Sequence, residues 1–393
     1  MSFASFHHGT RLAESNETPV LVQIGQTAVV GLVGTAPDAD PGKFPLNKPI
    51  LLNGRITEAA GLGNAGTLMD AIKSVFCHIG AYVIFIRVEE GADAAATLAN
   101  VLGDAALQTG VHALLRAKAD TGLEPTLIAV PGFTSGDGVT KPPVVSELES
   151  ILDELEAVGF VDGPDVDDAT AIAYRRLINS RRIMIIDSKR LEYDADTAQM
   201  IAMPGSSYAA GLQALVDEKL GVQHSLSNKP VSKGVEGWTR VANYPKQSNL
   251  LNENGISTIV NHGEGPVFWG NRVATSDDLW AFMSVRRAAD FVNKAIRKAF
   301  LEYVDKPLSA ANVRFILESG NAAMRNFKAQ GIILDGRLWL EEERNDPTEL
   351  AAGKITLSMD LEPPAPMEDA RFIAGRNIQY HLELNKEALK AAA

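Results

Sequence analysis

The sequence predicts a multidomain protein that mixes α/β and α+β architecture and carries extended β-strand arms at both termini. Three observations support this fold class: buried strand-length runs alternate with helical segments up to about residue 240, the last third combines a hairpin with long helices and alternating strands, and both ends contain alternating apolar runs. At 393 residues the chain is also long for one hydrophobic core. We therefore expect an N-terminal arm (1–25), one or two α/β domains (26–240), a C-terminal mixed domain (241–375) and a C-terminal arm (376–393).

The first part of the α/β region has the pattern of a βαβ unit. Residues 27–34 form a continuous apolar run of strand length, as in a strand that is buried on both faces. Thr67 is a candidate N-cap for a helix over 68–78, and Gly80 follows that helix. Residues 82–88 are the next β-branched and aromatic run, so strand, helix and strand follow at the expected spacing.

The middle of the chain repeats this alternation of helices and buried strands, which favours one or two layered α/β domains. In chain order we expect one or two helices over 93–119, a strand over 125–130, a helix over 146–158 that ends at Gly159, a helix over 169–179 with Asp168 as candidate N-cap, a strand over 182–187, and a helix over 206–220 that ends at Gly221.

The last third has a more mixed pattern. A turn at 252–255 precedes a hairpin, a long amphipathic helix, a second helix and two strands, and a proline-rich segment then blocks continuation. The expected elements are hairpin strands over 256–260 and 267–272, a helix from Ser276 to about Tyr303, a helix from Ser309 to Gly331, and strands over 332–340 and 354–361.

The two terminal arms have one apolar face each. In the N-terminal arm the strand-like run 19–24 places three side chains on one face, and in the C-terminal arm the run 377–385 alternates strictly. A lone strand with one apolar face needs a partner, either its own domain or a neighbouring subunit. The residues on these faces are Val20, Val22 and Ile24, and Ile378, Tyr380, Leu382 and Leu384.

Composition excludes several classes of protein. The formal net charge of −12 argues against a wide nucleic-acid contact, which requires dense lysine and arginine on one surface. No apolar run approaches the roughly 18 residues of a membrane helix, so we expect no membrane insertion. The single cysteine, Cys77, excludes an internal disulfide framework and a cysteine-based metal cluster.

The motifs of common enzymes do not fit the sequence. Residues 30–36 are glycine-containing but lack the Gly-Lys-Ser/Thr ending of a phosphate loop, and the glycine-rich loop 131–138 lacks a lysine at the required spacing. The seven histidines form no HExxH pair, and no GxSxG elbow is present. We therefore expect no catalytic, cofactor-binding or metal site and no cofactor. An α/β enzyme or nucleotide-binding protein is the alternative, which thermal stabilisation by ATP or NAD would favour.

The long helix expected from Ser276 to Tyr303 carries a basic stripe. Five cations fall within roughly 120° of arc when the residues are plotted on a helical wheel, and apolar side chains occupy the opposite side. The stripe is either a solvated face with local ion pairs or a docking surface for an acidic partner. Its residues are Arg286, Arg287, Lys294, Arg297 and Lys298.

A set of short motifs runs in a fixed order through most of the chain. The most informative stretch, 250–305, contains Leu-Asn-Glu-Asn-Gly, the hairpin, Phe-Trp-Gly-Asn-Arg and the helix with adjacent arginines. Others are His-His-Gly at 7–9, Thr-Ala-Val-Val-Gly at 27–31, Phe-Pro-Leu-Asn-Lys-Pro at 44–49, Val-Asp-Lys-Pro at 304–307 and Ala-Gly-Lys at 352–354. In this order they resemble the contractile tail sheath proteins of myophages, R-type pyocins and related injection machines, most closely those of temperate phages. The resemblance is thinnest from about 95 to 240.

The resemblance implies a structural polymer subunit and not an enzyme. Sheath proteins form stacked hexameric discs, joined as a six-start helix around a tail tube, and their terminal arms donate strands to neighbouring subunits. For this chain it implies that the partners are further copies of itself, the tail tube protein, and baseplate and tail terminator proteins. A different phage structural protein, such as a tube or baseplate component, is a further alternative, although a tube protein should be shorter and richer in strands.

The resemblance also implies roles for the parts of the chain. The α/β region would form the outer part of the sheath, and the C-terminal domain would line the tube with the basic stripe facing it. Contraction would drive the tube through the target cell envelope. The protein would be located in a virion tail or tailocin particle that assembles in the bacterial host cytoplasm.

Overall fold

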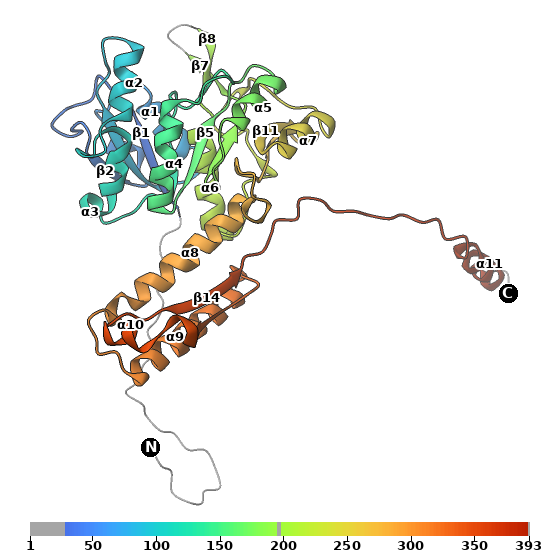
Figure 1. The fold of residues 1–393 in the computed structure, drawn as a ribbon. Coiled ribbons are helices and arrows are strands. Elements are labelled where there is room, and N and C mark those ends of the chain that lie inside the picture. Colours follow the sequence, from blue (N-terminus) through green and yellow to red (C-terminus); the bar gives the residue numbers. More distant parts are fainter. Residues whose placement is uncertain (1–27, 195–197, 392–393) are drawn as a thin grey trace, which may run out of the picture.

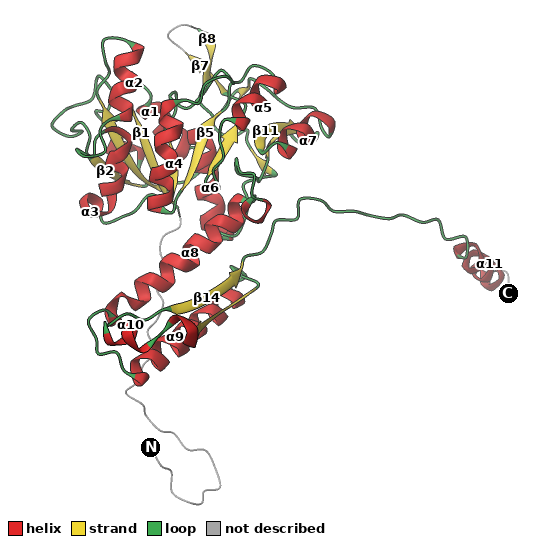
Figure 2. Cartoon of the chain, in the orientation of Figure 1, coloured by secondary structure: helices red, strands yellow, loops and turns green. Residues whose placement is uncertain are grey.

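The computed structural model describes residues 28–194 and 198–391. These residues form an α/β domain and a small domain, which are connected by the long helix α8 (Met283–Phe300). A C-terminal arm extends away from both (Figures 1 and 2), and in the structure it begins at residue 363, directly after β14, and not at 376 as expected. The mixed fold class expected from the sequence is confirmed.

The α/β domain is built on a nine-stranded sheet with the order β2–β3–β1–β4–β5–β6–β11–β12–β9. The strands from β3 to β11 are parallel, whereas β2, β12 and β9 each run antiparallel to a neighbour. The strands are β1 (Val29–Thr35), β2 (Pro49–Asn53), β3 (Tyr82–Val88), β4 (Leu127–Ala129), β5 (Val158–Asp162), β6 (Ile183–Ile186), β9 (Lys229–Pro230), β11 (Ile256–Asn261) and β12 (Pro266–Trp269).

Helices cover both faces of this sheet, which is why its central strands are apolar throughout. One core lies under α1 (Leu68–Phe76) and α6 (Ser206–Leu220). The opposite core lies under α2 (Ala94–Leu102), α4 (Pro143–Leu155), α5 (Asp168–Arg176) and α7 (Lys246–Glu253), together with the 3-10 helix η2 (Gly110–Arg116). Two short elements, η1 (Ile56–Ala59) and α3 (Ala117–Thr121), complete this part of the chain.

Strand β5 was not predicted, because the helix before it was predicted to extend too far. The expected helix over 146–158 ends at Leu155, and Glu156 adopts a left-handed conformation with φ 48°. The chain then enters the buried strand β5, so Gly159 is a strand residue and not the end of a helix. A Cβ on Gly159 would lie 2.7 Å from Cδ1 of Leu152, so the glycine allows α4 to pack closely on this strand.

The hydrogen bonds at two predicted helix N-caps differ from the prediction. The side chain of Asp167, and not that of Asp168, accepts the hydrogen bond from Thr170 N at the start of α5. Asp168 instead pairs with Arg240. Thr67 occupies the N-cap position of α1, but its hydroxyl accepts from Thr35 N and so ties the helix to the end of β1.

The expected domain boundary at 240/241 does not match the structure. Strand β11 pairs in parallel with β6, and β12 pairs with β11, so the hairpin belongs to the sheet of the α/β domain. The hairpin looked separate because a parallel pairing between distant strands leaves no local signal. The α/β domain therefore continues to the start of α8.

A second, three-stranded sheet with the order β10–β7–β8 projects from the α/β domain. It consists of β7 (Arg190–Asp194), β8 (Gln199–Met203) and β10 (Gly237–Trp238). The sequence did not predict it, because these strands are short and carry few buried apolar side chains.

The small domain combines two helices with a two-stranded sheet. Helix α9 (Ala310–Ala329) starts at Ser309, whose hydroxyl accepts from Asn312 N at 3.3 Å as the sequence predicts. The sheet pairs β13 (Asp335–Leu340) with β14 (Leu357–Glu362) in antiparallel fashion. The remaining elements are η4 (Leu301–Tyr303), η5 (Glu342–Arg344) and α10 (Pro347–Ala351). Met324, Phe327 and Leu338 are the centre of its core.

Candidate assembly interface

Helix α8 contributes to the cores of both domains. Its first residue, Met283, lies in the α/β core, whereas Ala288 and Val292 lie in the core of the small domain. The helix begins at Met283 and not at Ser276 as expected, because Asp277 caps the separate 3-10 turn η3 (Asp278–Trp280). Since one continuous helix serves both cores, the helix fixes the orientation of the two domains relative to each other.

The second residue of the predicted basic stripe, Arg287, is buried. Arg287 makes two hydrogen bonds to Asp217 of α6, one of them 2.7 Å between Nη1 and Oδ1. The exposed fractions of the two side chains are only 4% and 0%. Gln213 also donates to Asp217 Oδ1 at 2.7 Å. Arg287 is therefore an internal connection between α8 and α6 and does not belong to an exposed surface.

A second buried pair lies one turn further along α8. Asp290 accepts from Arg182, which precedes β6, with 3.1 Å between Nη2 and Oδ1. Arg286 donates to the same carboxylate at 2.6 Å, and its guanidinium lies 4.1 Å above the ring of Trp280. Asp290 thus binds two arginines next to the start of β6. Arg286 therefore already pairs with an acidic group of its own chain.

The next two cations of the stripe also bind the α/β domain. Lys294 Nζ donates to Glu124 Oε1 at 2.6 Å and to the carbonyl of Leu155, and Arg297 pairs with Glu156. Burial acts to raise the pKa of Glu124, but hydrogen bonds from Lys294 and Lys118 outweigh it and lower the pKa below its usual value. The stability that these bonds contribute is therefore present above the ordinary pKa and is lost as pH falls through the lowered one.

The stripe is thus mainly a connection between domains. Only Arg286 has an ion pair within its own helix, so the first alternative, a solvated face with local pairs, does not describe most of the stripe. The second alternative, a docking surface that faces the tube, stays a prediction. Among the five predicted residues, Lys298 is the exposed cation for which the described residues show no ion pair. Sequence reasoning missed Asp217, Glu124 and Glu156, because these partners lie 70 or more residues away in the chain.

The two-stranded sheet of the small domain is open mainly at its β14 edge, because the Asn321 side chain of α9 hydrogen-bonds Leu338 N and O at the β13 edge. Within the described residues no further strand pairs with β13 or β14. One face of the sheet packs on α9 through Leu338, and the other carries Arg337, which pairs with Asp360. A two-stranded sheet is marginal by itself, and its unpaired backbone groups are a template for an added strand.

The C-terminal arm differs from its prediction. Residues 363–379 form neither helix nor strand, and Tyr380–Ala391 form the helix α11 (Figure 1). Ile378, Tyr380, Leu382 and Leu384 are all exposed. The strand expected over 377–385 is therefore wrong for the isolated chain. Without a partner a strand has no ladder, whereas the sequence Asn-Lys-Glu-Ala-Leu-Lys-Ala is rich in helix formers. Val20, Val22 and Ile24 of the other arm lie outside the described residues.

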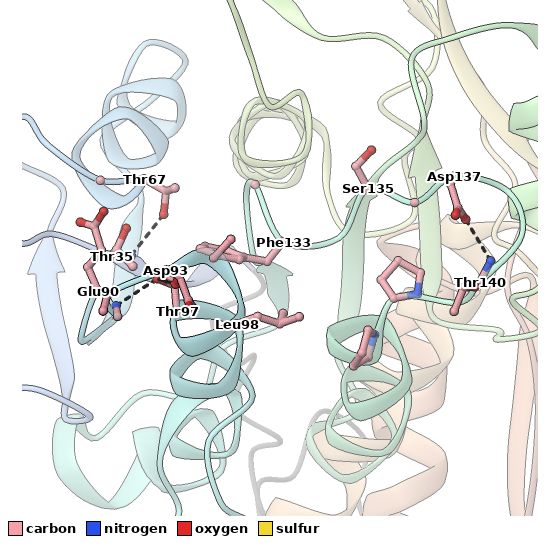
Figure 3. A pocket seen from close by; sticks show the side chains of 18 of the residues that line it. Thr35, Thr67, Glu90, Asp93, Thr97, Leu98, Phe133, Ser135, Asp137 and Thr140 are labelled. Atoms are coloured by element: carbon pink, nitrogen blue, oxygen red, sulfur yellow. Dashed lines mark hydrogen bonds between the residues drawn. The ribbon is translucent and has the colours of Figure 1, made fainter.

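The glycine-rich loop 131–138 lines a crevice of about 950 Å³ at the carboxyl ends of β1 and β4 (Figure 3). This is the point where the chain order reverses, since β1 lies between β3 and β4. The polar side chains of the loop hold the loop itself: Ser135 donates to the Gly163 carbonyl, and Asp137 accepts from Thr140 N at 2.9 Å. Lys141 pairs with Glu149. The arrangement accounts for these side chains without a ligand.

Within residues 28–194 and 198–391 no helix is both long and apolar enough to cross a membrane. The same residues contain no group of three or more histidine, cysteine or acidic side chains arranged to hold a metal ion.

Two family models match adjoining parts of the chain. The phage tail sheath protein central domain matches residues 106–274, and the phage tail sheath C-terminal domain matches residues 275–373. The tail sheath protein of Escherichia phage P2 is 32% identical over 381 residues, with 93% of this chain and 94% of the phage protein covered.

Two solved structures have the same fold. The first is the contracted sheath complex of an extracellular contractile injection system, PVC, with TM-score 0.72, 16% identity, and 96% of this chain and 100% of that chain covered. The second is the six-fold symmetrised baseplate of the anti-feeding prophage, with TM-score 0.70, 18% identity, and 95% of this chain and 100% of that chain covered.

Proposed function

This chain belongs to the phage tail sheath family, and from that premise we propose that it polymerises as stacked hexameric rings in a six-start helix around a tail tube. It is a structural subunit of a contractile tail sheath, and its relatives are structural proteins and not enzymes. In the proposal, contraction of the polymer drives the tube through the envelope of a target cell.

The observation that carries the proposal is the combination of an open sheet and an unpaired arm in one chain. Among the described residues no strand pairs with the outer edge of β14, whereas Asn321 of α9 occupies Leu338 N and O at the edge of β13. The described part of the C-terminal arm exposes apolar side chains to solvent. If the arm of one copy binds the small domain of the next, the contact is heterologous and propagates into rings and helical filaments. A neighbour of the same fold lies in a six-fold symmetrised baseplate, which supports six copies per ring.

The connection through α8 supports contraction by rigid-body movement. Buried pairs such as Arg287–Asp217 hold the two domains in one orientation, so subunits would rotate as units while the arms stay attached. The N-terminal arm with Val20, Val22 and Ile24 is proposed as a second inter-subunit strand, and Ile378, Tyr380, Leu382 and Leu384 as the contact face of the C-terminal arm.

The proposed partners are further copies of the chain, the tail tube protein, the baseplate and the tail terminator. The particle is a phage tail or related contractile tail, and assembly is proposed to take place in the cytoplasm of the bacterial host. The α/β domain is proposed to lie on the outside and the small domain next to the tube.

Expression of the chain alone tests self-assembly. At rising protein concentration and low salt, negative-stain electron microscopy should show striated hollow tubes, because each added subunit supplies both an arm and an open sheet. Particles that stay monodisperse at every concentration would contradict the proposal that the chain polymerises by itself.

The tube contact is proposed to depend on Lys298 more than on the rest of the basic stripe. Lys298 is exposed, whereas Arg286, Arg287, Lys294 and Arg297 bind acidic groups of their own chain. Lys298→Glu should lower the yield of tube-bound sheath several-fold in co-expression with the tube protein, and leave self-assembly intact. The matched control is Arg325→Glu, a charge reversal at an exposed position of α9. Equal yields for the two variants would exclude Lys298 as a tube contact.

A further inference from the structure

The C-terminal arm is attached to the α/β domain at a defined place. After β14 ends at Glu362, the chain passes the edge of the α/β domain before it turns away toward α11 (Figure 1). In this passage, which we call the strap (residues 363–369), Glu368 accepts two hydrogen bonds from Arg272, which follows β12. The distances are 2.8 Å from Nε to Oε1 and 2.6 Å from Nη2 to Oε2.

The arginine of this pair is itself held in place. Its guanidinium carbon lies 5.0 Å from the centre of the Phe282 ring, and Arg272 and Phe282 also form an isolated antiparallel β-bridge. Phe282 directly precedes α8. A planar guanidinium that stacks on a ring and binds both carboxylate oxygens has little freedom left, so it defines the direction of its partner as well as the distance.

Among the described residues, the hydrogen bonds between the strap and the α/β domain are those of Glu368. A cavity of about 540 Å³ lies between it and the α/β domain, lined by Pro366 and Met367 on one side and by Tyr244 and Trp269 on the other. Beyond the strap, Phe372 and Ile373 are almost completely exposed. The strap is buried at its start, Pro363, but a hollow lies under it from Pro366 onward, so the Arg272–Glu368 pair is the attachment that positions its outer part.

We propose that Arg272 and Glu368 form a latch that sets the direction in which the C-terminal arm leaves the subunit and so presents the arm to a second copy of the chain. The two are positioning residues, and the inference rests on the proposed polymerisation. Without the latch the segment after the proline-rich run, 367–379, is free, with a root-mean-square reach of roughly 18–22 Å. The arm would then spend less time where a neighbour can bind it, which lowers its effective concentration there.

The first test measures how widely the position of the arm varies in the monomer, at a protein concentration below that needed for assembly. One spin label is attached at Leu107→Cys on the α/β domain and a second at Ala374→Cys on the arm, in a Cys77→Ser background. Pulsed electron paramagnetic resonance then gives the distribution of distances between the two labels. We expect a clearly broader distribution in Arg272→Glu and in Glu368→Arg than in the parent. The double variant Arg272→Glu/Glu368→Arg should recover most of the narrow distribution, because the pair is restored with reversed charges.

A neighbouring ion pair provides the control. Arg371 and Asp369 also pair, but their side chains are 87% and 60% exposed and lie on the arm itself. Arg371→Glu should leave the distribution unchanged. The latch would be overturned if the distance distributions were identical in the parent, both single variants and this control. It would also be overturned if the distribution of the double variant were as broad as those of the single variants.

The second readout separates the latch from the proposed function. In the unlabelled chain, each single charge reversal should raise the protein concentration needed for tubes by about fivefold, and the double variant should reverse most of this increase. Tubes at an unchanged concentration in the single variants would overturn the role of the latch while leaving polymerisation established. If the parent chain forms no tubes, the proposed self-assembly fails, and the distances in the monomer still decide whether the latch exists.

Discussion

Removal of residues 377–393 is expected to abolish polymerisation and leave a folded, soluble monomer. The described residues of this segment are exposed and contribute to no core, so their loss removes no packing within the subunit. The proposed contact with the next copy, however, consists of these residues. Electron microscopy of the truncated chain should show no tubes, while circular dichroism should show a thermal transition close to that of the full chain. Tubes of normal appearance would contradict the role of the arm.

The bound conformation of the arm can be determined with point variants. In a strand Tyr380, Leu382 and Leu384 share one face, whereas in the helix α11 Leu382 points roughly 160° away from Tyr380. Substitution of each by aspartate, with Glu383→Lys as the matched control, should reduce tube formation at all three positions if the arm binds as a strand. If it binds as α11, Tyr380 and Leu384 should behave alike and differ from Leu382.

Loss of the buried Arg287–Asp217 pair is expected to cause the largest change in stability. Asp217→Ala leaves a buried guanidinium without its counter-charge and removes an acceptor from Gln213. The free energy of unfolding should fall by about 3–5 kcal/mol, which is typical when one partner of a buried pair is removed. Urea denaturation followed by circular dichroism measures this change.

Two comparison variants show whether charge burial is the cause. Asp217→Leu/Arg287→Met removes both charges and should regain most of the lost stability, because no uncompensated charge remains. Asp120→Ala breaks the Arg116–Asp120 pair, whose side chains are 29% and 38% exposed, and should cost less than about 1 kcal/mol. Equal losses in Asp217→Ala and Asp120→Ala would mean that the buried pair does not stabilise the contact between α8 and α6.

The sequence by itself predicted the elements whose signals are local. The apolar runs that became β1, β3, β4 and β6 are continuous because helices bury both faces of the sheet. Helix α6 has the predicted bounds, since Gly221 with φ 106° ends it. The ordered motifs indicated the family, which the comparisons show. The choice of structural subunit over enzyme was therefore available from the sequence.

Tertiary structure decided how these parts are joined. Arg287 and Lys298 lie on the same predicted arc, yet the first is buried against Asp217 and the second is exposed, because α8 packs on α6 near only one of its ends. Strand β5 was masked by the helix before it, and the hairpin β11–β12 was assigned to the wrong domain. The arm folded as a helix where alternation predicted a strand. In each case the outcome depends on groups far away in the sequence, or on a partner that the single chain does not contain, and local periodicity carries no information about either.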